Sequence, residues 1–216
     1  GVLYPSINLS FEVFGPALHS APVVLVNHAL TGNSTVTGES GWWNDLIGDN
    51  KTIDTQKYTV VAFNVPGNGY DETLLENYSD FTARDVARLF LEGIRSLEID
   101  QFYAIIGGSV GGGIAWEMVA LEPAITQHLI AIATDWKSTD WLIANCFVQE
   151  QILNNSSKPI EDARSHAMLC YRTPESFKEK FGRSRHEEKN IFNVESWLIH
   201  HGARLQSRFQ LASYKL

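Results

Sequence analysis

Residues 102–121 read FYAIIGGSVGGGIAWEMVAL, and this stretch decides the fold. The apolar run 102–106 predicts a buried strand, and residues 110–121 predict a helix. Between them, Gly107-Gly108-Ser109-Val110-Gly111 matches the pattern G-x-S-x-G. On a sharp strand-to-helix turn, this pattern exposes a serine hydroxyl above the edge of a sheet. Ser109 is therefore a candidate nucleophile, and the alternative is a glycine-rich turn that binds phosphate or only packs tightly.

Strands and helices alternate through the first two thirds of the sequence. The short apolar or alternating runs that predict further strands are residues 7–14, 22–26, 58–63 and 129–133, and residues 82–97 predict a helix. This alternation is typical of a largely parallel sheet that is covered on both faces. The sequence thus predicts the α/β class, with residues 7–14 as an edge strand.

The pattern changes after Thr134. Four helices and no strand are predicted from there on, over residues 138–153, 160–171, 174–181 and 192–216. A helical lid inserted after a strand of the sheet would have this pattern. We therefore expect two parts, a sheet core over residues 1–136 and a helical lid over residues 137–216.

Composition limits the classes of partner. Of the 216 residues, 44% are hydrophobic, which is enough for one substantial core. The formal net charge of −8 opposes binding to nucleic acid, because that association depends on Lys and Arg neutralising phosphates. The sequence has no uninterrupted apolar stretch of membrane-spanning length and no signal-peptide pattern at its start, so we expect a cytoplasmic protein without a membrane partner.

The cysteines and histidines do not predict a metal or redox site. Cys146 and Cys170 lack CxxC spacing and lie in apolar segments, so we expect two buried thiols in a reducing compartment. The adjacent His200 and His201 would point to different sides of a helix, and no other His or Cys cluster has ligand spacing. We expect no metal and no bound cofactor.

A second loop complements the serine turn. Asn27-His28-Ala29-Leu30-Thr31-Gly32 directly follows an early strand, where α/β-hydrolases place the second donor of the oxyanion hole. The candidate donors are the backbone N–H groups of Leu30 and Val110. In these enzymes the catalytic histidine follows the serine in the chain, whereas His28 precedes it. We therefore expect His28 to hold the loop by hydrogen bonds rather than to act as the base.

Several blocks in order along nearly the whole chain resemble the homoserine O-acetyltransferase family of the α/β-hydrolase superfamily. The blocks that carry this resemblance are His28-Ala29-Leu30-Thr31-Gly32, Gly41-Trp42-Trp43, Thr82-Ala83-Arg84-Asp85-Val86, the serine turn itself, Tyr171-Arg172-Thr173-Pro174-Glu175-Ser176-Phe177, Val194-Glu195-Ser196-Trp197-Leu198, Arg208-Phe209 and Ser213-Tyr214. This is much more specific than the G-x-S-x-G match alone.

The resemblance implies a two-step acyl transfer in methionine biosynthesis. Ser109 would take an acetyl group from acetyl-CoA and pass it to the hydroxyl of L-homoserine, with acetyl-CoA as a co-substrate rather than a resident cofactor. It also implies that Arg208 and Tyr214 line a tunnel beside the serine, and that the lid forms a homodimer. A guanidinium suits a substrate carboxylate because it donates two parallel hydrogen bonds. From residue type and position alone, an ordinary ion pair is an equal alternative for Arg208.

The sequence also departs from that family. The triad Asp and His of the family lie beyond its lid and are not present in this chain, so we expect that the C-terminal part of the core is absent and that the chain is a fragment. Asn64–Asp71 replaces a Gly-Ser-rich loop, and residues 153–163 are contracted, which weakens the prediction of the acceptor. A serine esterase or thioesterase of the same fold is the first alternative function, and a non-catalytic protein of this fold is the second.

Overall fold

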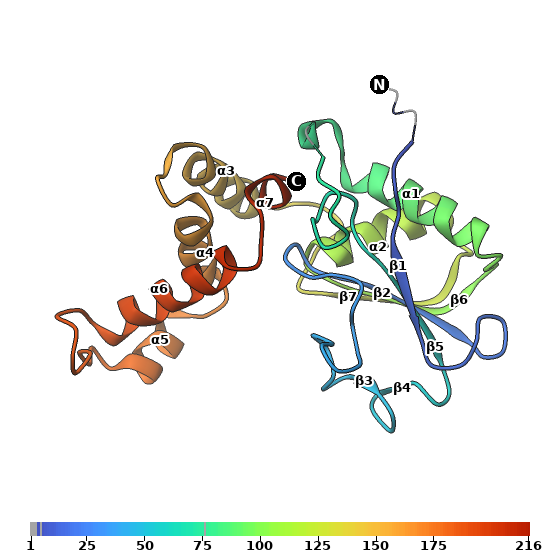
Figure 1. The fold of residues 1–216 in the computed structure, drawn as a ribbon, viewed down its shortest axis with the longest axis horizontal. Coiled ribbons are helices and arrows are strands. Elements are labelled where there is room, and N and C mark those ends of the chain that lie inside the picture. Colours follow the sequence, from blue (N-terminus) through green and yellow to red (C-terminus); the bar gives the residue numbers. More distant parts are fainter. Residues whose placement is uncertain (1–3, 5, 76) are drawn as a thin grey trace. The chain divides into compact units, whose positions relative to one another are not determined.

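The computed structural model describes residues 4, 6–75 and 77–216 (Figure 1). The chain forms two compact units. Gly1–Lys137 together with Leu216 forms the unit that we call the sheet unit, and Ser138–Lys215 forms the helical unit. The serine turn belongs to the first unit, and the last four predicted helices belong to the second.

The sheet has five strands in the order β1-β5-β2-β6-β7. Along the chain they are β1 (Phe11–Phe14), β2 (Val23–Asn27), β5 (Thr59–Phe63), β6 (Phe102–Gly108) and β7 (Thr126–Ile132). Only the pairing of the edge strand β1 with β5 is antiparallel, and the other pairings are parallel. The predicted α/β class with a mostly parallel sheet is confirmed.

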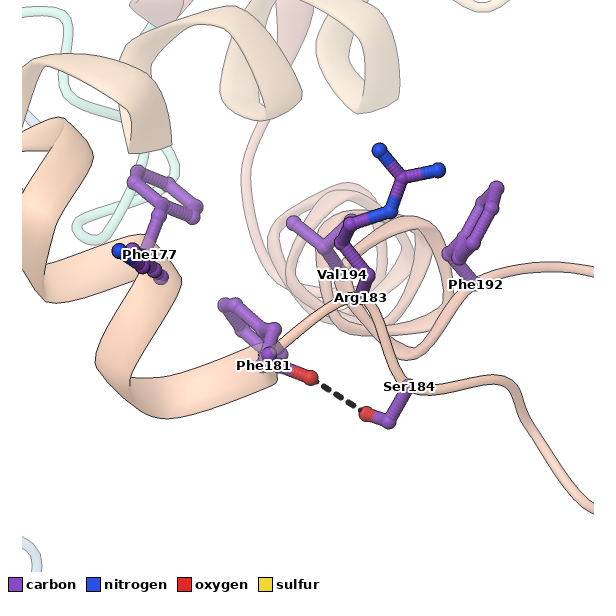
Figure 2. Close-up of a pocket in the computed structure, with 8 residues that line it drawn as sticks. Phe177, Phe181, Arg183, Ser184, Phe192 and Val194 are labelled. Carbon is purple, nitrogen blue, oxygen red and sulfur yellow. Dashed lines mark hydrogen bonds between the residues drawn. The ribbon is translucent and has the colours of Figure 1, made fainter.

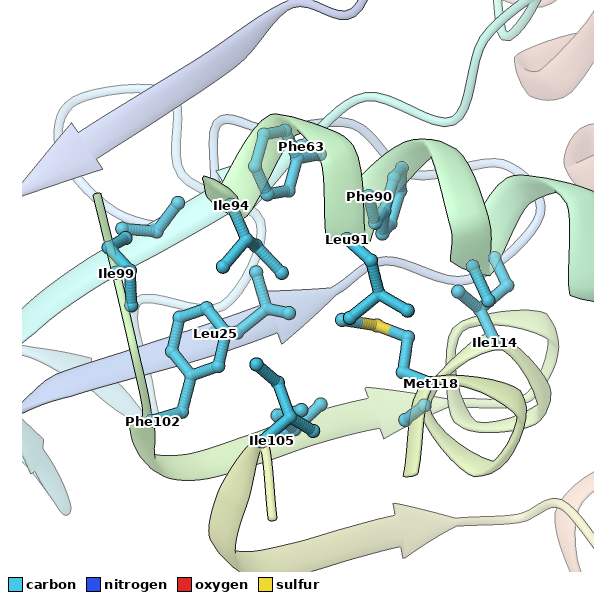
Figure 3. Close-up of a cluster of buried hydrophobic side chains, with 14 of the residues drawn as sticks. Leu25, Phe63, Phe90, Leu91, Ile94, Ile99, Phe102, Ile105, Ile114 and Met118 are labelled. Carbon is cyan, nitrogen blue, oxygen red and sulfur yellow. The ribbon is translucent and has the colours of Figure 1, made fainter. Parts of the chain in front are cut away.

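Helices cover one face of this sheet. α1 (Ala83–Ser96) and α2 (Val110–Leu121) share a buried cluster with the strands, in which Leu25, Phe63 and Phe102 lie against Phe90 and Met118 (Figure 3). Each such side chain is at most 1% exposed. Burying one of them stabilises the fold by about 1.5–3 kcal/mol. This cluster holds the end of β6 and the start of α2, and therefore the serine turn, on a rigid base.

Loop residues and two short strands of the sheet unit pack on the opposite face. Val36, Ile47 and Ile53 pack there against Val24 and Val60. Two of these residues belong to short parallel strands, β3 (Ile47–Gly48) and β4 (Ile53–Asp54), which the sequence analysis missed. A strand of two residues is too short for an alternating pattern, so only tertiary structure reveals it.

Local sequence determines where α1 begins. Thr82 accepts a hydrogen bond from the N–H of Asp85, and the Asp85 carboxylate accepts one from the N–H of Thr82. This reciprocal capping box satisfies two donors that have no partner within the helix. The predicted helix over residues 82–97 is thus confirmed to within its two caps.

The helical unit contains α3 (Asp140–Asn155), α4 (Pro159–Cys170), α5 (Pro174–Phe181), α6 (Asn193–Gln206) and α7 (Leu211–Lys215). The prediction of one helix over residues 192–216 is wrong, because α6 ends at Gln206 and a turn precedes α7. At this turn Phe209 is buried and its ring lies 6.0 Å from that of Tyr214. The turn between α6 and α7 contains no Gly or Pro that would signal a helix end in the sequence, and it is the side chain of Phe209 that is buried there.

The prediction that the cysteines are buried is also wrong. Cys146 on α3 and Cys170 at the end of α4 are both exposed free thiols. The reason is that α3 is apolar on most sides and buries only Leu153 fully, while Trp141 and Phe147 remain 75% and 61% exposed. None of the helices in the described ranges is long and apolar enough to cross a membrane.

Candidate active site

Ser109 occupies a strained turn between β6 and α2. Its φ of 51° and ψ of −120° lie in a region that residues other than glycine rarely adopt. Such a conformation costs on the order of 1–3 kcal/mol and persists only where the surrounding structure imposes it. Ser109 is exposed, and its N–H donates to the carbonyl of Ile132 on β7 at 2.9 Å. The strand-turn-helix context that the G-x-S-x-G pattern requires is therefore present.

Two glycines make the turn possible. A Cβ atom at Gly107 would lie 2.2 Å from the carbonyl oxygen of Gly111. A Cβ atom at Gly111 would lie 2.3 Å from the carbonyl oxygen of Asn27 on β2. Both distances are far inside van der Waals contact with backbone that has no room to move. The glycines thus let α2 begin directly against the neighbouring strand, beneath Ser109.

The first turn of α2 provides a donor beside the serine. Val110 is the first residue of the helix, and the N–H of a first residue has no acceptor within the helix. The carbonyl of Ser109 already accepts from the N–H groups of Gly112 and Gly113, at 3.0 and 3.1 Å. The positive end of the helix dipole adds favourable potential for a negative oxygen at this place. The N–H of Val110 is therefore available to donate a hydrogen bond to a negatively charged oxygen beside Ser109.

The loop with Leu30 leaves the same edge of the sheet. β2 and β6 are parallel neighbours, and Asn27 pairs with Gly107 in their register. The chain after Asn27 and the turn at Ser109 thus continue from equivalent ends of adjacent strands. Within this loop the N–H of Gly32 donates to the carbonyl of Ala29 at 2.8 Å, which closes a tight turn around Leu30. The topology places both predicted donor segments at one edge.

His28 is a structural clamp under this loop. Its side chain is 1% exposed, and its Nε2 accepts from the N–H of Val65 at 3.0 Å. Because Nε2 is the acceptor, Nδ1 carries the proton and donates to the carbonyl of Ala29 at 2.7 Å. Burial lowers the pKa of His28 to about 4, although the bond to Ala29 opposes this effect. The imidazole is therefore neutral at physiological pH and has both nitrogens occupied.

Two buried asparagines extend the clamp. Asn64 and Asn68 follow β5 and are linked by a bond of 2.9 Å from Nδ2 of Asn68 to Oδ1 of Asn64. Oδ1 of Asn64 also accepts from the N–H of Ser34, at 2.9 Å. The sequence predicted only a turn in this segment. A composition rich in Asn, Pro and Gly does not indicate which other loop the side chains contact. The segment after β5 thus fixes the segment after β2.

No histidine among the described residues of the sheet unit is placed to act as a base for Ser109. Besides His28 it contains His19 and His128. His19 lies in the turn before β2, at the opposite end of that strand from His28. His128 pairs with Ala104 near the start of β6, whereas Ser109 follows the end of β6. Neither imidazole comes from the edge of the sheet where the serine lies.

The two predicted substrate contacts belong to the helical unit. Arg208 lies in the exposed turn between α6 and α7. Tyr214 on α7 is buried, and its hydroxyl donates to Oε1 of Gln149 at 3.4 Å. Burial raises the pKa of Tyr214 to about 12, so the phenol stays protonated at neutral pH. Their roles toward substrate stay predictions. The described residues contain no group of three or more His, Cys, Asp or Glu side chains placed to hold a metal ion.

Comparison with known proteins agrees with this geometry. Residues 22–188 match the alpha/beta hydrolase fold family, so the chain is a member of that superfamily. Homoserine O-acetyltransferase from Cyclobacterium marinum is 30% identical over 99% of this chain and 67% of its own length. The chain belongs to the homoserine O-acetyltransferase family.

Solved structures agree with the fold. The crystal structure of homoserine O-acetyltransferase from Staphylococcus aureus superimposes with a TM-score of 0.80 at 27% identity, and the match covers 97% of this chain and 63% of that one. Esterase E22 has the same TM-score of 0.80 at 19% identity, over 96% of this chain and 70% of its own. The chain spans about half to two thirds of the length of the curated relatives that it matches.

Proposed function

We propose that the protein transfers an acetyl group from acetyl-CoA to the hydroxyl of L-homoserine through an acyl-Ser109 intermediate. The observation that carries this proposal is the serine turn, in which an exposed hydroxyl precedes the free end of a helix. Membership of the homoserine O-acetyltransferase family supports the choice of donor and acceptor.

In the first step, Oγ of Ser109 attacks the thioester carbonyl. The bond from oxygen to carbon forms, and the N–H groups of Val110 and Leu30 donate to the negative oxygen. The carbon–sulfur bond then breaks, and CoA leaves as the thiol with the proton that came from Ser109. In the second step the homoserine hydroxyl attacks the acyl-serine, which releases O-acetylhomoserine and restores the serine.

Three further roles belong to the proposal. A histidine other than His19, His28 and His128 takes and returns the proton, because His28 has both ring nitrogens occupied and neither of the other two lies at the serine edge of the sheet. Arg208 holds the carboxylate of homoserine through paired hydrogen bonds. Tyr214 lines the acceptor site as a neutral phenol, and its raised pKa supports this state.

The test is release of CoA from acetyl-CoA by the natural full-length protein, measured with and without L-homoserine. Release that depends on homoserine and is lost in Ser109→Ala supports the transferase. If a fluorophosphonate probe leaves the wild-type serine unlabelled and Ser109→Ala behaves as the wild type does, the protein is a non-catalytic member of the fold.

A serine esterase or thioesterase is the second candidate. The similarity of fold to esterase E22 favours it, and the same acyl-serine gives hydrolysis when water replaces homoserine as the acceptor. This activity would release CoA from acetyl-CoA, or p-nitrophenol from p-nitrophenyl acetate, at the same rate with and without homoserine. Detection of acyl-Ser109 does not separate the two candidates, since both form it.

We also propose a cytoplasmic homodimer that associates through the helical unit. The support is the exposed apolar surface of α3, where Trp141, Ile143 and Phe147 are each more than half exposed. Exposed apolar surface of this kind marks protein interfaces. Light scattering of the full-length protein should give twice the monomer mass, and Phe147→Glu should return it to the monomer.

A further inference from the structure

The helical unit contains a basic, aromatic pocket that the proposed acyl transfer does not yet use. Its volume is about 730 Å³, which is within the range of small-molecule sites. The residues that line it and enter the argument are Tyr171, Arg172, Ser176, Lys180, Trp197 and His201. They come from the turn after α4, from α5 and from α6, so that three segments line one hollow.

Two cations of this pocket have no carboxylate partner. The ion pairs among the described residues include neither Arg172 nor Lys180. Arg172 instead donates from Nη1 to the hydroxyl of Ser176 at 3.2 Å. No Asp or Glu is among the described residues that line the hollow. Two exposed positive charges without counter-ions favour a ligand with more than one negative charge.

Both cations converge on one indole ring. The guanidinium carbon of Arg172 lies 5.8 Å from the centre of the Trp197 ring, and Nζ of Lys180 lies 5.5 Å from it. Phe177 and Phe181 hold Trp197 from α5, with ring centres at 5.9 and 5.6 Å. Both cations thus lie over the indole ring, so that positive charge and aromatic surface are combined in one hollow, which suits a ligand with phosphates and a planar base.

The charge around His201 supports the positive potential of this region. Its ring lies 4.6 Å from that of Trp197. Burial lowers the pKa of His201, and the nearby charges of Arg164, His200, Arg204 and Lys180 lower it further. The surroundings therefore disfavour an additional positive charge, as expected where an anion binds.

We propose that this pocket, with Arg172 and Lys180 beside Trp197, binds the phosphorylated adenine nucleotide of the acyl-CoA donor. The guanidinium and the ammonium pair with phosphate oxygens, and the adenine packs against the aromatic side chains that line the hollow. The identity of the nucleotide rests on the proposed function, whereas the preference for a planar polyanion rests on the pocket alone.

A neighbouring pocket provides the contrast. It has a volume of about 590 Å³, and the residues that line it include Phe177, Phe181, Phe192 and Val194 (Figure 2) together with Arg183 and Lys178. Lys178 lies on the same helix as Lys180 but lines only this more apolar hollow. Lys178→Gln is therefore a matched control, because it removes the same charge from the same helix.

The first experiment measures binding of adenosine 3′,5′-bisphosphate, adenosine and inorganic phosphate to the full-length protein by calorimetry. We expect the bisphosphate to bind more tightly than either fragment. Arg172→Gln and Lys180→Gln, singly and together, should weaken it, by about tenfold or more in the double variant, while Lys178→Gln changes it by less than about twofold. Equal binding by inorganic phosphate, no binding at all, or an unaltered double variant would overturn the proposal.

The second experiment separates this pocket from the serine chemistry. With acetyl-CoA, the double variant should show a KM raised about tenfold at unchanged kcat. With S-acetylpantetheine, which lacks the nucleotide, it should match the wild type. An equal loss with both thioesters would overturn the assignment. If neither thioester is consumed but the bisphosphate still binds, the proposed acyl transfer fails and the pocket stands.

Discussion

The sheet unit and the helical unit keep their apolar side chains in different places. Buried apolar residues run through β2, β5, β6, α1 and α2, whereas α3 exposes Trp141, Ile143 and Phe147. The charge differs as well. Residues 1–137 carry 16 Asp and Glu against 6 Lys and Arg, and residues 138–215 carry 9 against 11. The comparison teaches that an acidic, packed scaffold bears the proposed nucleophile, while a basic unit with exposed apolar surfaces is suited to recognising anions and partners.

The largest expected effect breaks the chemistry of the sheet unit without unfolding it. Ser109→Ala should lower kcat by roughly 10⁴-fold or more, because the nucleophile is removed. Ser109→Gly should lose activity equally but raise the free energy of unfolding by about 1 kcal/mol, since glycine accepts a positive φ without strain. Rates and urea denaturation check both. A less stable glycine variant would mean that the turn is not strained.

Two phenylalanines compare the packing of the units directly. Phe90 on α1 is 0% exposed, and Phe147 on α3 is 61% exposed. We expect Phe90→Ala to cost about 3–5 kcal/mol of unfolding free energy, because it leaves a cavity in the core. Phe147→Ala should cost less than about 0.5 kcal/mol in the monomer. Denaturation of each variant at low protein concentration tests this difference, and equal losses would contradict it.

Two glycines of α2 sharpen the same comparison within one helix. Gly111→Ala should cost about 3 kcal/mol, because its Cβ would lie 2.3 Å from a backbone oxygen. At Gly113 the nearest atom to such a Cβ is Oγ1 of Thr134, at 3.9 Å. Gly113→Ala should therefore stabilise the helix by about 0.5–1 kcal/mol. Thermal unfolding of both variants provides the measurement, and a stable Gly111→Ala would show that the turn has room.

The last prediction concerns the dependence of unfolding free energy on the protonation of His28. The pKa of His28 is about 4 in the folded chain and 6.5 in the unfolded one. Between these values the unfolded chain binds a proton that the folded chain does not, so the contribution is complete above pH 6.5 and is lost as the pH falls toward 4. It amounts to about 2–3 kcal/mol between pH 7.5 and 4.5. Urea denaturation at both values measures it, and His28→Asn should show a smaller loss. An identical loss in that variant would remove His28 as the cause.

Much of the fold and the strand-turn-helix setting of Ser109 followed from local sequence. The prediction for α2 was right at both ends, and that for α1 was right to within one residue at each end, because short-range patterns determine these features. The neutral state of His28 depends on burial in the folded chain, and its Nε2 accepts from the N–H of Val65, which is far away in the sequence. Periodicity also fails for α3, because a helix that is apolar on most sides does not tell which face is covered.

The edge strand β7 has a consequence for handling the protein. It pairs only with β6 within the described sheet, and Ile130 and Ile132 on it are 44% and 42% exposed. Its sequence, TQHLIAI, has neither the Lys nor the Pro that commonly discourage strand addition. A polypeptide consisting of residues 1–216 alone therefore presents a template for edge-to-edge aggregation. Insolubility on expression of this length would report on an uncovered strand and not on a failure of the serine turn to fold.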